Sequence, residues 1–197
     1  MKKILLLLLL SLTFIGSANA NSIKGAFGYK LGEVQEPEKK ECDTDDYSHC
    51  YTLSDFDPVN PLPYFEHYYF VTTFTTNKIQ YIKAYVNREY KYSDSCDSSN
   101  SDFGKTRLML EAKYGDFESH WFGDGKWYKF EDGDRSIFLR CAITDGFCRN
   151  SSSGYDSCKI YDMELTYKDD MLGRQNDDEK KAFIRKKFEE ESKDYDL

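Results

Sequence analysis

Residues 68–86, with the sequence YYFVTTFTTNKIQYIKAYV, form the longest run of strand-forming residues in the chain. The run is interrupted once, by the residues TTNK at 75–78. It therefore predicts two antiparallel strands around a short turn. The rest of the chain is expected to cover or extend this hairpin.

Alternation along the hairpin places apolar side chains on both faces of the sheet. In the first strand, Phe70, Thr72 and Phe74 share one face, and Tyr69, Val71 and Thr73 share the other. In the second strand, one face carries Ile79, Tyr81 and Tyr85, and the opposite face carries Ile82, Ala84 and Val86. This pattern predicts a central hairpin with a helix on one face and other protein on the second. The alternative is a one-sided sheet with aromatic side chains exposed for a partner, but large exposed apolar patches are uncommon on monomers.

The segments before the hairpin alternate between strand and loop signals. Residues 23–32 predict a strand with one apolar face, and residues 33–48 predict an exposed polar loop. Residues 51–55 predict a short strand. Prolines at 58, 61 and 63 then predict a connection rich in turns, because proline cannot donate to a strand ladder.

The segments after the hairpin predict one helix, two strand pairs and a terminal helix. A helix is expected from Ser101 to Tyr114, ended by Gly115, followed by a loop at 116–125. A second hairpin is expected at 127–143, and residues 159–167 predict a strand with one buried face. Asn176 and Glu179 predict the start of a charged helix over 177–197. This order predicts a single α+β domain over residues 21–197, with a largely antiparallel sheet, one packed helix and a charged C-terminal helix.

Residues 1–20 predict a cleaved signal peptide, with Lys2 and Lys3 before an apolar stretch and cleavage near Ala20. Cleavage would leave 177 of the 197 residues and change the formal charge from -8 to -10, because two lysines are lost. We therefore expect a soluble periplasmic or secreted protein without stable membrane insertion. The acidic charge also disfavours nucleic acid as a partner.

Six cysteines in an exported chain predict three disulfides that staple the fold. They are Cys42, Cys50, Cys96, Cys141, Cys148 and Cys158. Six cysteines allow fifteen pairings, so the connectivity is open. The pairs 42–50 and 148–158 each bracket a polar loop, which favours two local bridges and leaves 96–141 as a long-range link.

No catalytic or cofactor motif occurs in the chain, so we predict no catalytic residue, no metal site and no cofactor. His49, His67 and His120 do not have the spacing of metal ligands, and the cysteines lack a C-x-x-C pair. The unusual feature is the content of 16 tyrosines and 14 phenylalanines. Tyrosine and tryptophan favour recognition surfaces, although a sheet also needs aromatic residues for packing. The candidate binding surface comprises Tyr64, Tyr68, Trp121 and Trp127.

Three motifs resemble those of a family of uncharacterised small exported bacterial proteins. They are the opening GAFGYKLG at 25–32, the hairpin segment YYFVTTFTTNKI at 68–79 and LEAKYG at 110–115. Leu165, Tyr167 and Asp169 match the family's closing strand, whereas Phe74 stands where the family often has proline. The resemblance covers most of the mature chain and implies one cysteine before the helix and one in a later strand, consistent with a Cys96–Cys141 bridge. It implies no activity.

Three functions remain open from the sequence. The leading hypothesis is a non-enzymatic binding, inhibitor or immunity-type protein that recognises a protein or glycan of the cell envelope. The second is a hydrolase with an unrecognised pair of carboxylates, and the third is a structural protein of the envelope.

Overall fold

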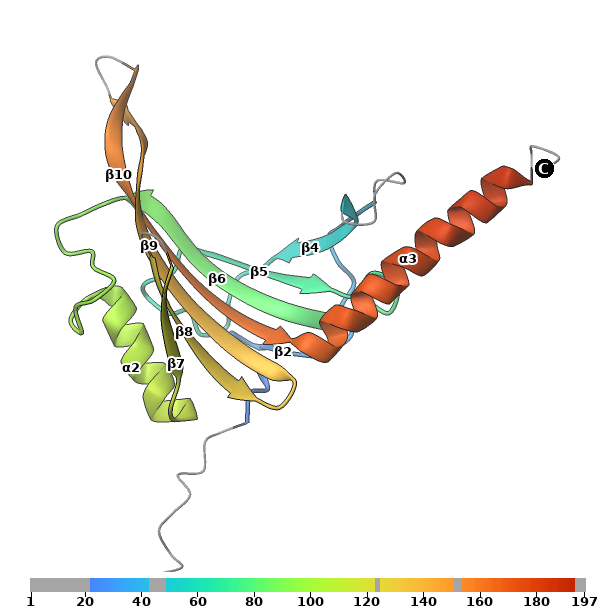
Figure 1. Cartoon of the computed structure of the whole chain (residues 1–197), viewed down its shortest axis with the longest axis horizontal. Helices are drawn as coiled ribbons and strands as arrows, with labels where there is room; N and C mark the ends of the chain where they lie inside the picture. The colour runs from blue at the N-terminus through green and yellow to red at the C-terminus, as the bar shows by residue number, and fades with distance from the viewer. Residues whose placement is uncertain (1–21, 43–48, 123–124, 151–153, 194–197) are drawn as a thin grey trace, which may run out of the picture.

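The computed structural model describes residues 22–42, 49–122, 125–150 and 154–193. Eight strands form one sheet in the order β3-β4-β5-β6-β10-β9-β8-β7, and neighbouring strands are antiparallel. Helix α2 lies beside this sheet and helix α3 projects from it (Figure 1). The predicted α+β class with a largely antiparallel sheet is confirmed. The predicted signal peptide lies outside the described residues, as do residues 43–48 of the polar loop and residues 194–197.

The strands and helices have the following bounds. The sheet contains β3 (Lys39–Glu41), β4 (Tyr51–Asp55), β5 (His67–Thr72), β6 (Ile79–Glu89), β7 (Glu118–Phe122), β8 (Gly125–Asp132), β9 (Arg135–Asn150) and β10 (Gly154–Asp169). A separate small ladder contains β1 (Gly25–Ala26) and β2 (Tyr29–Lys30). The helices are α2 (Asp102–Tyr114) and α3 (Asp170–Ser192).

The hairpin of β5 and β6 lies in the middle of the sheet, as its sequence predicts. The expected face of Ile79 was wrong, because the register shifts by one residue. Val71 pairs with Tyr81 whereas Thr72 pairs with Ile79. Such a bulge reverses the alternation on one side of it. Ile79 is consequently buried in the core, whereas Tyr81 lies on the opposite face.

Three segments differ from the sequence predictions. Residues 23–32 form a tight hairpin rather than one strand, with Phe27 and Gly28 at positive φ in its turn. Strands β3 and β7 stand where exposed loops were predicted, and they form the two edges of the sheet. Edge strands are often short and polar, so their sequences resemble those of loops.

Three disulfides join Cys42 to Cys50, Cys96 to Cys141 and Cys148 to Cys158, which are the pairs that the loop spacing favoured. Cys148 and Cys158 do not bracket an irregular loop, because β9 and β10 continue past them as one long hairpin. Cys96 lies before α2 and Cys141 lies in β9. The second bridge therefore ties the covering helix to the sheet.

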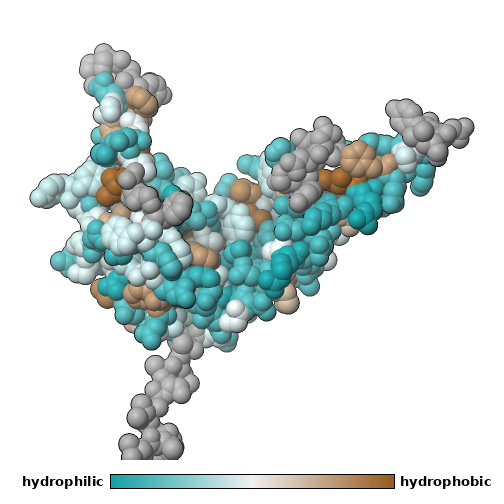
Figure 2. Space-filling model, in the orientation of Figure 1, coloured by the Kyte–Doolittle hydropathy of each residue, from teal (hydrophilic) through white to brown (hydrophobic). Residues whose placement is uncertain are grey.

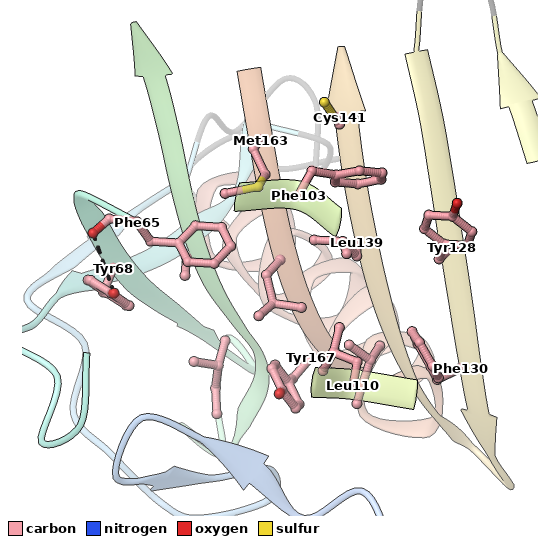
Figure 3. Packing of buried hydrophobic residues seen from close by; sticks show 14 of the residues in the cluster. Phe65, Tyr68, Phe103, Leu110, Tyr128, Phe130, Leu139, Cys141, Met163 and Tyr167 are labelled. Carbon is pink, nitrogen blue, oxygen red and sulfur yellow. Dashed lines mark hydrogen bonds between the residues drawn. The ribbon is translucent and has the colours of Figure 1, made fainter. Parts of the chain in front are cut away.

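Helix α2 covers the core face of the sheet. The Ser101 hydroxyl accepts a hydrogen bond from Gly104 N at 3.1 Å, and Gly115 ends the helix at φ 84°, as predicted. Its side chains Phe103 and Leu110 point at residues from β8, β9 and β10, among them Tyr128, Leu139 and Tyr167 (Figure 3). This burial removes the apolar side of α2 from water and fixes the helix on one face.

Helix α3 begins earlier than its sequence indicates, at Asp170 with Asp169 as its N-cap. Asn176 and Glu179 therefore lie inside the helix instead of capping it. Asn176 Oδ1 accepts a hydrogen bond from Phe74 N at 2.7 Å, and a Glu179 oxygen accepts one from Thr75 N at 2.6 Å. Both side chains dock α3 on the turn between β5 and β6. The remainder of the helix extends outward and is largely hydrophilic on its visible side (Figure 2).

Candidate functional site

The face of the sheet opposite α2, which we call the open face, carries charged and aromatic side chains that are only partly buried. Strand β10 shows the contrast. Met163 and Leu165 are fully buried on the core face, whereas Asp162, Glu164 and Thr166 are half-buried on the open face. Burial of the second face by other protein was expected for the central hairpin. The alternative of aromatic side chains left accessible agrees better with the structure.

One aromatic group on the open face comes from β5 and β6. The Tyr69 ring meets the Tyr81 and Tyr85 rings edge to face, with centroids 6.2 and 6.0 Å apart. His67 stacks on Tyr85 at 4.8 Å. These side chains are cross-strand neighbours on one face, so the strand pairing of the hairpin gathers them.

A second aromatic group lies across β7, β8 and β9. His120 stacks on Trp127 at 4.3 Å, and the Trp127 ring lies 6.1 Å from that of Phe138. Lys129 Nζ lies 5.6 Å from the centroid of the Phe138 ring, within the range of a cation–π contact. The open-face side chains of β10 separate the two groups.

Lys83 and Glu164 form an ion pair within the first aromatic group. The distance from Lys83 Nζ to Glu164 Oε2 is 2.8 Å, and Nζ lies 5.7 Å from the Tyr69 ring centroid. Burial would lower the pKa of Lys83, but hydrogen bonding and charge interaction with Glu164, with a further contribution from Tyr69, raise it above its usual value. Lys83 is thus a permanent cation held between a carboxylate and an aromatic ring.

The neighbouring Tyr81 stays protonated across the physiological range. Burial raises the pKa of its phenol well above the usual value, and the proximity of Tyr69 and Glu164 raises it further. A neutral phenol can donate a hydrogen bond, but it does not supply an anionic base or nucleophile at neutral pH.

One hollow on the open face lies beside this ion pair, and a second lies next to it at the start of β5, where Phe56 and Tyr68 also line it. One has a volume of about 580 Å³ and includes Asp55, Tyr69, Lys83 and Tyr85 in its lining. The other has a volume of about 700 Å³ and lies toward the proline-containing connection before β5. Asp55 and Tyr85 line both hollows, which are therefore adjacent, and we call the two together the groove. A groove of this size can accept a short segment of another molecule.

The structure does not bring the four predicted surface residues into one patch. Tyr68 is buried in the core, where its hydroxyl donates to Leu62 O at 3.0 Å, and Tyr64 packs against the same core. Trp121 is 63% exposed, with Lys126 Nζ 4.7 Å from its ring centroid. Trp127 lies on the adjacent strand, but its alternation places it on the open face and Trp121 on the other. Of the four, Trp127 belongs to the open face.

The residues of the open face that the sequence reasoning missed are Asp55, Lys83, Tyr85, Asp162 and Glu164. Their signal is alternation, since Lys83 and Tyr85 flank the buried Ala84 and Glu164 flanks the buried Leu165. That signal identifies a solvent-facing row on each strand. It does not show that β6 pairs with β10, which is what places Lys83 beside Glu164.

The cysteine side chains and two of the histidine side chains are already engaged in other contacts. All six cysteines are in disulfides, which leaves no thiol nucleophile. His67 and His120 are each stacked on an aromatic ring, and no cluster of metal-ligating side chains occurs in the described ranges. None of the helices in the part of the chain that the structure describes is long and apolar enough to cross a membrane.

The chain matches no protein-family model, no curated protein and no solved structure.

Proposed function

We propose that the protein is an exported, non-enzymatic binding protein of the inhibitor or immunity type, and that the open face is its recognition surface. The observation that carries this proposal is the partial exposure of tyrosine, tryptophan and phenylalanine side chains from four strands on one sheet face. Aromatic rings give a large contact area at a low cost in conformational entropy, which is why they are enriched in recognition surfaces.

The disulfides support the assignment to an oxidising compartment. Three bridges persist outside the cytoplasm, where thiols are not kept reduced. The predicted signal sequence supports export to the periplasm or the extracellular space. The partner is then a protein or glycan of the cell envelope, or one that arrives from outside the cell.

The test is affinity capture from envelope extract under oxidising conditions, with the mature chain immobilised. We expect the wild-type chain to enrich a specific component, and the Tyr85→Ser variant to lose at least 90% of it. Tyr92→Ser is the matched control, because Tyr92 is fully exposed in the segment between β6 and α2. Enrichment should survive this control.

Two outcomes would contradict the proposal. Repeated failure to enrich any protein or glycan would remove a binding role. Enrichment that is equal for the wild type and Tyr85→Ser, with further open-face substitutions such as Trp127→Ala also without effect, would place recognition elsewhere on the chain. Near-ultraviolet circular dichroism of each variant distinguishes a lost surface from a lost fold.

A further inference from the structure

We propose that the groove on the open face binds an extended, lysine- or arginine-containing segment of a protein partner. This inference rests on the proposed function, since it names the chemistry of the ligand for the same surface. It is carried by three features of the groove, which are its uncompensated negative charge, a cation already held there, and its length across the sheet.

The groove is lined by five carboxylates and one lysine. The carboxylates are Asp55, Asp57, Glu66, Asp162 and Glu164, and the lysine is Lys83. Lys83 is paired with Glu164. In the described part of the chain no salt bridge joins any of the other four carboxylates to a basic side chain. The groove therefore has a negative potential that a basic ligand would neutralise and an acidic one would oppose.

Lys83 shows how the groove accommodates a cation. Its ammonium group lies against the Glu164 carboxylate and the Tyr69 ring. The adjoining part of the groove repeats these elements, because Tyr85 and Asp55 line it, but Lys83 is the groove's one basic side chain apart from His67. Aromatic faces attract ammonium and guanidinium groups, more strongly where water is partly excluded. A cationic side chain of a partner would therefore find a ring and a carboxylate together.

The direction of the groove favours an extended segment over a single small cation. Its lining comes from β4, β5, β6 and β10, which are consecutive in the sheet. Strands are spaced about 4.8 Å apart, so four strands span roughly 14 Å. An extended chain advances about 3.3 Å per residue, so roughly four residues fit across them. Alternate side chains of such a segment could reach Asp162 near one end and Asp55 near the other.

The experiment measures fluorescence anisotropy of labelled hexalysine and hexaarginine with the oxidised mature chain. Labelled hexaglutamate and a neutral chitin oligosaccharide are the comparison probes. We expect binding of the two cationic peptides, weakening as salt is raised, and no binding of the other two. Binding of the neutral oligosaccharide in their place would overturn the proposal in favour of a glycan site.

Two double variants distinguish binding in the groove from general electrostatic attraction to an acidic protein. Asp55→Asn with Asp162→Asn should weaken binding at least tenfold. Asp177→Asn with Asp178→Asn changes the net charge equally on exposed positions of α3, and should weaken it less than twofold. Equal losses in both double variants would contradict the proposal.

Removal of the internal cation gives a gain of affinity that non-specific attraction does not predict. Lys83→Met releases Glu164 for the ligand and should strengthen hexalysine binding by at least threefold. Lys180→Met on α3 is the control with the same change of charge. If envelope capture depends on Tyr85 while none of these charge variants affects either capture or peptide binding, the proposed binding function stands and the cationic ligand is wrong.

Discussion

Strand β10 contributes alternate side chains to both faces of the sheet, and the two sets have opposite chemistry. Tyr161, Met163, Leu165 and Tyr167 are buried under α2 and the N-terminal hairpin. Asp162, Glu164, Thr166 and Lys168 alternate with them on the open face and are half-buried. Both sets of side chains belong to one strand, which pairs with β6 on one side and with β9 on the other. The difference shows that α2 buries one face of the sheet, whereas the open face stays partly accessible and is the surface that we propose for recognition.

The largest loss of stability should follow from removing the disulfide that holds α2 over the core face. The Cys96–Cys141 bridge closes a separation of 45 residues and ties the segment before α2 to β9. In the chain-entropy model, its loss destabilises the fold by about 4 kcal/mol. We expect the Cys96→Ser/Cys141→Ser variant to show this loss as a lower midpoint in urea denaturation.

The matched control removes the bridge at the far end of the β9–β10 hairpin. The Cys148–Cys158 bridge closes only 10 residues, and its removal should cost about 2.5 kcal/mol or less. A larger loss from this variant than from Cys96→Ser/Cys141→Ser would contradict the assignment of the second bridge to holding α2 on the sheet.

Neighbouring residues of β10 provide the most direct test of the two faces. Leu165 is fully buried, and Leu165→Ala should destabilise the protein by about 3 kcal/mol through lost burial and a residual cavity. Thr166→Ala changes the next residue on the open face and should alter the free energy of unfolding by about 0.5 kcal/mol or less. Urea denaturation of the two variants measures both, and similar losses would show that the open face is buried by something other than α2.

The sequence predicted the strands better than their surroundings. Strong alternation at 159–167 and the turn at Asp132 and Gly133 were sufficient to locate β8, β9 and β10. The edge strands β3 and β7 were missed because neither sequence, KKE or ESHWF, alternates between apolar and polar residues. The side of Ile79 was missed because a bulge leaves no signal in a single sequence.

The position of the candidate surface could not be predicted from the sequence. Tyrosine and tryptophan enrichment indicated a recognition surface, yet only Trp127 of the four named residues lies on the open face. The pairing of Lys83 with Glu164 joins residues 81 positions apart, and it depends on which strands are neighbours in the sheet. Alternation predicts on which face of a strand a side chain lies. A site assembled from four strands can be predicted only when the order of the strands in the sheet is known.

Polar contacts should stabilise the fold most where they are removed from water, and the docking of α3 tests this. Asn176 is 4% exposed and satisfies the backbone N–H of Phe74. Asn176→Ala leaves that donor buried without a partner and should cost about 2 kcal/mol. Asn176→Asp keeps the acceptor but buries a charge, so it should recover only part of the loss, whereas Asp178→Ala on the exposed side of α3 should have little effect. Urea denaturation at pH 7 compares the three variants, and an unchanged midpoint for Asn176→Ala would show that α3 is held by other contacts.

Glu179, one turn further along α3, should give the smallest effect and the only one that depends on pH. Burial would raise the pKa of its carboxyl group, but hydrogen bonds from Thr75, Thr76 and Gln175 lower it below the usual 4.5. A lowered pKa in the folded state means that the charged carboxylate stabilises the fold above pH 4.5, and that this stabilisation is lost as the pH falls through the folded-state value. Because Glu179 is partly exposed, we expect a contribution on the order of 1 kcal/mol.

The comparison of wild type with Glu179→Gln at two pH values isolates this contribution. At pH 7 the variant should be the less stable, because its neutral amide accepts the turn hydrogen bonds more weakly than a carboxylate does. At pH 3 the difference should shrink, since protonation removes the charge from the wild-type side chain as well. A difference that is equal at both pH values would show that Glu179 acts through the shape of its side chain, and that α3 docks on the β5–β6 turn without help from its charge.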